Sequence, residues 1–167
     1  TTFSLLQKDL TMTPLSPLSR TDFKTRVLER DGHRCVKCNR SLNDGVRLDA
    51  HHILERRLWP DGGYHLDNGA TLCDDGEQGC HWQAETTQLS VEEIRSLCGI
   101  SRPLLPPDLY PDTPVDKWGN PILDDGRRAR GPLFDDPSVQ KILTDHLHLF
   151  TDRVKYGRTW HLPWSPG

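Results

Sequence analysis

The chain has 167 residues, a mass of 19.1 kDa, a formal net charge of −3 at pH 7 and a mean hydropathy of −0.66. This length fits one small domain with an extension, and 13 prolines and 13 glycines leave too little apolar material for a large core. No apolar run approaches the roughly 18 residues that a membrane helix requires, so we expect no membrane partner. The net charge does not indicate nucleic-acid binding, although a local basic patch can act within an acidic total.

The first residues, TTFSLLQKDLTM, show no signal-peptide pattern, so we expect a cytoplasmic (intracellular) protein. In a reducing compartment, paired cysteines hold metal ions more often than they form disulfides. The chain lacks an initiator methionine and ends at Ser-Pro-Gly. These ends suggest a piece of a longer polypeptide, with a covalently linked or docked partner domain after the C-terminus. The oligomeric state is left open.

The first regular element expected is a helix with an N-cap at Ser19 or Thr21 and an end at Gly32. Phe23, Val27 and Leu28 recur at helical spacing and should face the core. Basic residues occupy the other faces, where a solvated surface is favoured over a phosphate-contacting one. These residues are Lys24, Arg26 and Arg30.

Four cysteines indicate a zinc site. Cys35 and Cys38 form a C-x2-C knuckle, a spacing at which both thiolates can reach one tetrahedral zinc. Cys73 and Cys80 form a looser pair, which could complete the site if residues 74–79 loop out. Such a closed four-thiolate site would be structural, since it has no open coordination position. Four reduced, buried cysteines without metal are the alternative.

The histidines fall between and after these cysteines. Residues 46–50 alternate as a short strand should and lead into His51 and His52, whose side chains are expected to point to opposite faces. A helix that follows the last cysteine of the cluster, over 81–87, would set His81 and Glu85 on one face at i and i+4.

The remaining chain carries fewer signals. Ser90 and Glu93 form a capping-box pattern for a helix that ends at Gly99, with Val91, Ile94 and Leu97 inward. Five prolines within residues 102–114 predict an extended linker over the surface.

A further helix is predicted over 136–150, because Asp136 can cap it and Pro137 suits its first position. Its apolar stripe is interpreted as a docking face. Residues 155–167 match no packed element.

The block from Phe23 to Glu85 resembles the HNH endonuclease family. The residues that carry this resemblance are CVKC, AHHI, GG, LDNGATLC and CHWQAE. The resemblance implies an α+β fold with zinc knuckles and a small ββα-metal (HNH) core. This core would bind one divalent ion. An N-terminal helix would precede this core, and a Pro-rich, partly helical C-terminal extension would follow it.

The resemblance also implies roles for individual residues. His52 would be the general base that activates the attacking water, and Asn68 would brace the loop and orient that base. His51 and His81 would hold the catalytic ion, with Glu85 as a further ligand. Two imidazoles with a carboxylate suit Mg, Mn, Ni or Zn, so the ion itself is not fixed.

Phosphodiester cleavage also needs cations that contact the substrate backbone. Arg34, Lys37, Arg56 and Arg57 are the candidates, and such contacts set position without reading sequence. The resulting hypothesis is a metal-dependent HNH endonuclease or nickase, with DNA favoured over RNA as the nucleic-acid partner.

A second resemblance lies in the tail. Residues 155–167 resemble the opening strand of some nucleotidyltransferase-type RNA ligases but lack the nucleotide-binding lysine motif, so no ligase activity is carried over. The chain would then be the N-terminal nuclease part of an RNA-repair or ligase protein.

Two alternatives from other classes are kept. One is a zinc-stabilised nucleic-acid-binding module without turnover, and the other is an interaction domain that docks through residues 136–150. The expected organisation is an extended N-terminal arm over 1–18, an HNH nuclease domain over 19–100, and a docking extension over 101–167.

Overall fold

The structure is a computed structural model that describes residues 16–156 and 159–161. Its mixture of helices and strands confirms the expected α+β class. The elements, in chain order, are α2 (Arg20–Arg30), β1 (Arg47–His52), β2 (Gly69–Asp74), α3 (Cys80–Glu85), α4 (Val91–Cys98), β3 (Arg128–Arg130), α5 (Pro137–Ile142), β4 (Phe150–Tyr156) and β5 (Thr159–His161). Among the described residues, no helix has both the length and the apolar character needed to cross a membrane.

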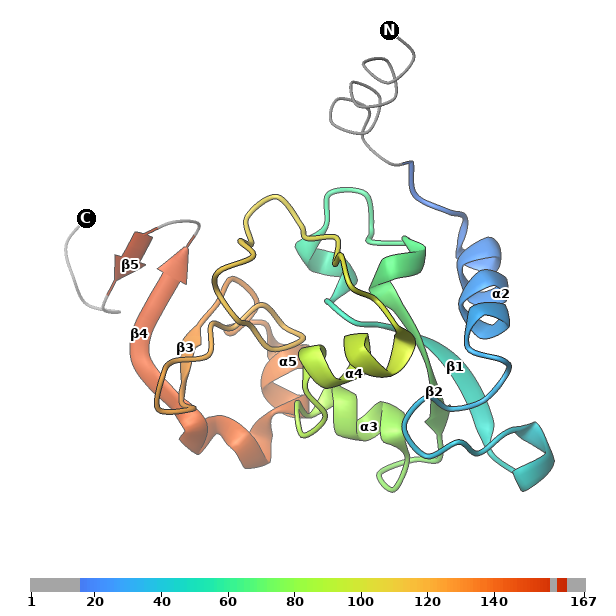
Figure 1. Cartoon of the computed structure of the whole chain (residues 1–167). Coiled ribbons are helices and arrows are strands. Elements are labelled where there is room, and N and C mark those ends of the chain that lie inside the picture. Colours follow the sequence, from blue (N-terminus) through green and yellow to red (C-terminus); the bar gives the residue numbers. More distant parts are fainter. Residues whose placement is uncertain (1–15, 157–158, 162–167) are drawn as a thin grey trace, which may run out of the picture.

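An antiparallel hairpin of β1 and β2 lies between α2 on one face and α3 on the other (Figure 1). Its register pairs Arg47 with Asp74 at one end and His52 with Gly69 at the other. Gly69 is required because α2 packs directly over it: an added Cβ would lie 2.4 Å from the Cγ2 atom of Val27. The hairpin therefore has two covered faces, and neighbouring residues of β1 meet different helices.

Helix α2 begins as expected. Ser19 is the N-cap, and its side chain accepts a hydrogen bond from the backbone N–H of Asp22. Phe23 and Val27 are buried, as their spacing predicted. Arg30 does not lie on a solvated face, because its guanidinium donates to the carbonyl oxygens of Leu66 and Gly69.

Helices α3 and α4 follow the predicted order with small differences. The helix expected over 81–87 is the six-residue α3. In α4, Ser90 caps the N–H of Glu93, but the Glu93 carboxylate pairs with Lys37 instead of completing the box. Leu97, predicted to face inward, is 43% exposed.

The prediction of a surface linker after α4 is wrong in part. Residues 101–114 contain no helix or strand, but Leu105 and Leu109 pack against the main hydrophobic core and Val115 is buried in it. The leucines between the prolines explain this, because their burial stabilises the fold by about 25 cal/mol for each Å² of apolar area removed from water. A second cluster of buried side chains follows in the extension, formed by Trp118, Val139 and Leu143.

The single helix expected over 136–150 is also corrected. Asp136 caps α5 at Pro137 as predicted, but α5 ends at Ile142 and a 3-10 helix continues from Thr144 to Leu149. The hydroxyl of Thr144 donates to backbone carbonyls one turn earlier, a local bond that competes with regular α-helix.

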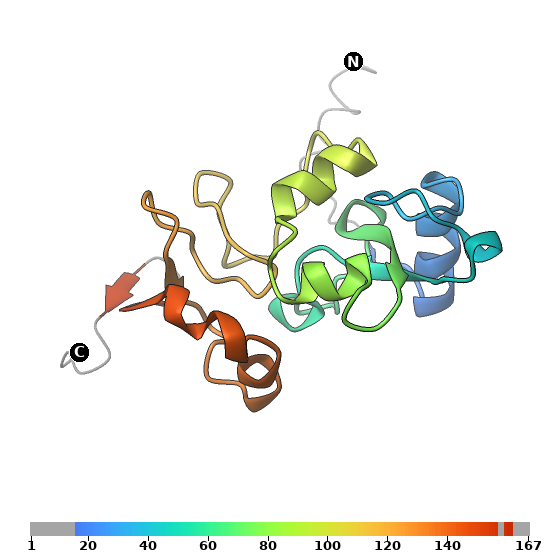
Figure 2. The ribbon, with the colours of Figure 1, turned by 90° about the horizontal axis from the view of Figure 1, so that it is seen from below.

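The tail is more ordered than expected. β4 pairs in parallel with β3 and antiparallel with β5, and this small sheet lies at the end of the molecule away from α2 (Figures 1 and 2). Residues 157–158 and 162–167, which carry most of the ligase-like motif, lie outside the described residues, as does the arm over 1–15.

Candidate functional site

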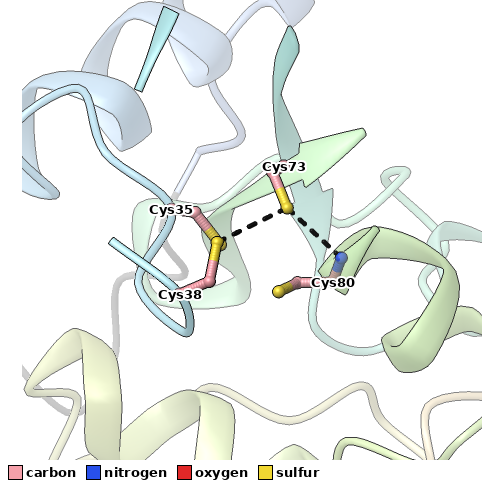
Figure 3. Close-up of side chains that lie close together, drawn as sticks. All are labelled: Cys35, Cys38, Cys73 and Cys80. Atoms are coloured by element: carbon pink, nitrogen blue, oxygen red, sulfur yellow. Dashed lines mark hydrogen bonds between the residues drawn. The ribbon is translucent and has the colours of Figure 1, made fainter. Parts of the chain in front are cut away.

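The four predicted cysteines come together. Cys35 and Cys38 lie in the loop after α2, Cys73 lies on β2, and Cys80 begins α3, with their sulfur atoms directed toward one another (Figure 3). All four sulfurs lie within 4.8 Å of one another, and none of the cysteines forms a disulfide. The Sγ atoms of Cys38 and Cys73 are 3.7 Å apart. In a tetrahedral zinc site with Zn–S bonds near 2.3 Å, two sulfur ligands lie about 3.8 Å apart. The cluster could therefore hold such an ion.

Arg40 is part of this cluster, which sequence reasoning missed. Its guanidinium donates to the sulfurs of Cys38, at 3.3 Å, and Cys73, at 3.5 Å. Burial opposes ionisation of Cys38, but the hydrogen bonds from Arg40 outweigh it and lower the pKa of this thiol to about 6. Burial raises the pKa of Cys73 and Cys80, so these two thiols need a metal ion to become thiolates at neutral pH.

A second group forms on the α3 face of the hairpin from His51, His81 and Glu85. The Oε1 atom of Glu85 lies 3.2 Å from Nε2 of His81 and 3.6 Å from Nδ1 of His51. Potential ligand atoms of the three residues lie within 4.8 Å of one another. The i, i+4 spacing on α3 supplies two of them, and β1 supplies the third.

His51 is buried, and neither of its ring nitrogens has a hydrogen-bond partner. Burial, together with the charge of Lys117, lowers the pKa of His51 well below its usual range. A neutral, unpartnered imidazole inside a protein is costly unless something binds it, and a metal ion is one such partner. This observation fits a divalent ion at the group.

His81 has a second set of neighbours. Its ring and the carboxylates of Asp49 and Asp74 also lie within 4.8 Å of one another. The group with His51 and Glu85 is the better candidate, because only that group contains a fully buried side chain without a partner.

His52 points to the other face of β1, as the alternation predicted. Its ring stacks on Phe23 at 4.7 Å between centroids and meets the edge of Tyr64 at 4.9 Å. Burial, followed by the charge of Lys117, lowers the pKa of His52 to about 4, so its imidazole is neutral at pH 7. Neutrality is the first requirement for a general base.

Both histidine faces open onto one cavity of about 480 Å³. His51, His52, His81 and Glu85 all contribute to its wall. The side chains of opposite strand faces can share a cavity here because β1 ends at His52.

Asn68 braces the loop that closes this region. Its amide nitrogen donates to the carbonyl oxygens of Leu54 and Gly63, and its amide oxygen accepts from the N–H of Leu54. The side chain is buried and contributes no wall to the cavity. Asn68 therefore acts on the site through the backbone that follows His52.

Replacing Asn68 by alanine should lower the free energy of unfolding by about 2–4 kcal/mol, because it removes three buried hydrogen bonds and takes these partners from the N–H and carbonyl of Leu54. The melting temperature should fall by about 5–15 °C in a thermal unfolding experiment. Asn43→Ala, at an exposed position, is the control. A melting temperature unchanged from the parent protein would contradict the bracing role.

The predicted phosphate contacts are placed unevenly. Arg56 is exposed and lines the cavity. Arg57 instead pairs with Glu55 and with the α5 cap, Lys37 pairs with Glu93, and Arg34 donates to a backbone carbonyl of its own loop. Two of the four predicted cations are thus already neutralised by carboxylates.

Two other cations line the cavity next to Arg56. Arg20 and Lys24 lie one turn apart on α2, are exposed, and form no ion pair with any described residue. Sequence reasoning favoured a solvated face for Lys24, and periodicity alone could not show that this face borders the histidines.

Lys117 was not predicted as a site residue, because it lies in the extension, yet it reaches the histidine site. Its ammonium lies 3.3 Å from Oε1 of Glu85 and 3.6 Å from Oε2 of Glu55, and it donates to the carbonyl of His52 at 2.9 Å. Burial opposes the charged form of Glu85, but the bond from His81 and the charge of Lys117 hold the pKa of this carboxyl below its usual range.

Comparison of the chain with models of known families, with curated proteins and with solved structures finds no match. The geometry of the two residue groups, together with the motif resemblance, is what supports a function.

Proposed function

We propose that the protein is a metal-dependent endonuclease or nickase of the HNH type that hydrolyses phosphodiester bonds, with DNA as the preferred substrate. The observation that carries the proposal is the grouping of His51, His81 and Glu85 on one face of the hairpin. His52, which follows His51 on β1, lines the same cavity. The cysteine cluster would hold a structural zinc that fixes the start of α3.

Two imidazoles and a carboxylate suit Mg, Mn, Ni or Zn, and they leave coordination positions open. When bound there, the ion supplies positive charge for the phosphoryl oxygens and the leaving group. His51, His81 and Glu85 would hold the ion, and Asn68 keeps the adjoining loop in position.

His52 accepts the proton of the attacking water. In the free protein its pKa of about 4 makes it neutral but a weak base. A phosphodiester in the cavity brings negative charge close to the ring, which favours the imidazolium and raises the pKa toward the useful range.

Arg20, Lys24 and Arg56 line the cavity, where their cations would contact substrate phosphates. Such contacts raise affinity for any sequence and make it dependent on salt. One histidine site cuts one strand, so a double-strand break would need a second copy or a second visit.

The proposal is tested by incubating the purified protein with supercoiled plasmid DNA and structured RNA over a panel of divalent ions. Metal-stimulated nicking of the plasmid is expected. If the protein bound nucleic acid but cut it with none of the ions, the proposal would be refuted and a zinc-stabilised binding module would be supported instead.

The double variant Arg20→Ala, Lys24→Ala should weaken nucleic-acid binding and lower the slope of log affinity against log salt by about 1.5–2, since each phosphate contact contributes about 0.9. The maximal cleavage rate should change little. Arg26→Ala, an exposed cation on α2 that does not line the cavity, is the matched control. An unchanged salt slope in the double variant would show that Arg20 and Lys24 of α2 do not contact the substrate phosphates.

A further inference from the structure

Lys117 enters the candidate active site from a part of the chain outside the HNH-like block. A tight turn holds it there: the buried carboxylate of Asp116 accepts hydrogen bonds from the N–H groups of Trp118 and Asn120. Trp118 in turn donates from its ring nitrogen to the carbonyl of Glu85, at the end of α3. The turn is therefore fastened to the helix that carries two of the candidate metal ligands.

The side chain of Lys117 is 5% exposed, and its ammonium is surrounded by two carboxylates and a backbone carbonyl. Its ammonium lies 3.3 Å from Oε1 of Glu85, the same oxygen that faces His81 and His51. The ammonium thus occupies a position beside the oxygen that a divalent ion would use.

Two positive groups cannot share this oxygen without repulsion. Charges a few ångström apart in a partly buried site interact more strongly than in water, and a divalent ion doubles the effect. Lys117 has other acceptors within reach, because the carbonyl of His52 lies 2.9 Å away and the carboxylate of Glu55 lies 3.6 Å away. It can therefore leave Glu85 without losing every partner.

After leaving Glu85, the ammonium of Lys117 would remain at the cavity. Its side chain lines the same cavity as His52 and Arg56, into which the substrate phosphate is proposed to enter. An ammonium at this place stabilises the negative charge that builds on a phosphate during hydrolysis.

We propose that Lys117 competes with the divalent ion for Glu85 and, once the carboxylate binds that ion, donates to a phosphate oxygen of the substrate. This inference rests on the proposed nuclease function. It makes Lys117 a catalytic residue and residues 101–156 part of the catalytic unit.

The test uses the full chain carrying zinc at its cysteine cluster, with Co²⁺ as the probe of the histidine site. Visible absorption reports Co²⁺ bound by nitrogen and oxygen, and the absence of thiolate bands shows that the zinc has stayed in place. The same preparations are assayed for single-turnover cleavage of plasmid DNA. The variants are Lys117→Met, Lys117→Arg and, as a matched control on exposed α5, Lys141→Met.

Lys117→Met should bind Co²⁺ about 5- to 10-fold more tightly, because the competing charge is gone. The same variant should cleave about 100-fold more slowly, because a transition-state donor is lost. Lys117→Arg keeps the charge and should bind Co²⁺ as the parent does, and Lys141→Met should match the parent in both assays.

Opposite effects on affinity and rate separate this role from a structural one. Weaker Co²⁺ binding by Lys117→Met would overturn the competition with the ion and leave Lys117 as a strut that orders the ligands. An unchanged cleavage rate would overturn the contact with phosphate. If Lys117→Met does not fold, Lys117→Gln supplies the same comparison, since it also removes the charge but keeps a donor for the His52 carbonyl.

Failure of the proposed nuclease function would look different. In that case the parent protein would not cut under any ion, while the Co²⁺ titration would still decide whether Lys117 and a metal ion compete for Glu85.

Discussion

Replacing His52 by alanine is expected to lower the cleavage rate by about 100- to 10,000-fold, because general-base catalysis is lost. Nucleic-acid affinity and zinc content should stay near the parental values, since His52 belongs to neither of the proposed metal groups. The rate is measured as nicking of supercoiled plasmid DNA at saturating protein, so that binding does not limit it.

The alanine variant also removes a ring that stacks on Phe23, which could lower stability. His52→Gln keeps more of this contact and should be as inactive, while the melting temperature reports the packing effect separately. His148→Ala, an exposed histidine in the extension, is the control. Parental cleavage of both plasmid DNA and structured RNA by His52→Ala would show that this residue is not the base.

The second large effect is expected at the cysteine cluster. Cys73→Ser should abolish zinc binding and unfold the protein, because metal binding to such sites is worth about 10 kcal/mol or more, against a total stability of about 5–15 kcal/mol. Circular dichroism and metal analysis of the purified protein measure both results. A strong chelator should produce the same unfolding in the parent protein.

Cys98→Ser is the matched control, since Cys98 lies outside the cluster at the end of α4. It should keep the zinc and most of the stability. If Cys73→Ser remained folded with unchanged zinc content, the four cysteines would not be the zinc site.

Loss of zinc should also disable the histidine site, because the two sites share α3. Cys80 begins this helix and His81 follows it directly. A helix of six residues is too short to be stable alone, since helices shorter than about 12–15 residues are marginal in water. It is held at its start by the cysteine cluster and at its end by Trp118.

Features that depend on local spacing could be predicted from the sequence. A cap for α2 was expected at Ser19 or Thr21 and is Ser19; His51 and His52 point to opposite faces of β1; and His81 and Glu85 lie one helical turn apart. These features follow from the periods of a helix and a strand, which neighbouring residues set. The grouping of the four cysteines was also predictable, because a zinc site needs a recognisable set of thiols.

Which charged side chains meet depends on tertiary packing and could not be predicted from the sequence. Lys117 reaches Glu85, Lys37 is neutralised by Glu93, and Arg30 fastens α2 to the hairpin. Strand β4 of the tail likewise depends on pairing with β3, and β5 depends on pairing with β4. The local sequence around a charged side chain or an edge strand does not predict a partner many residues away. That partner depends on how the apolar faces pack, and the hydrophobic effect that drives this packing is not directional.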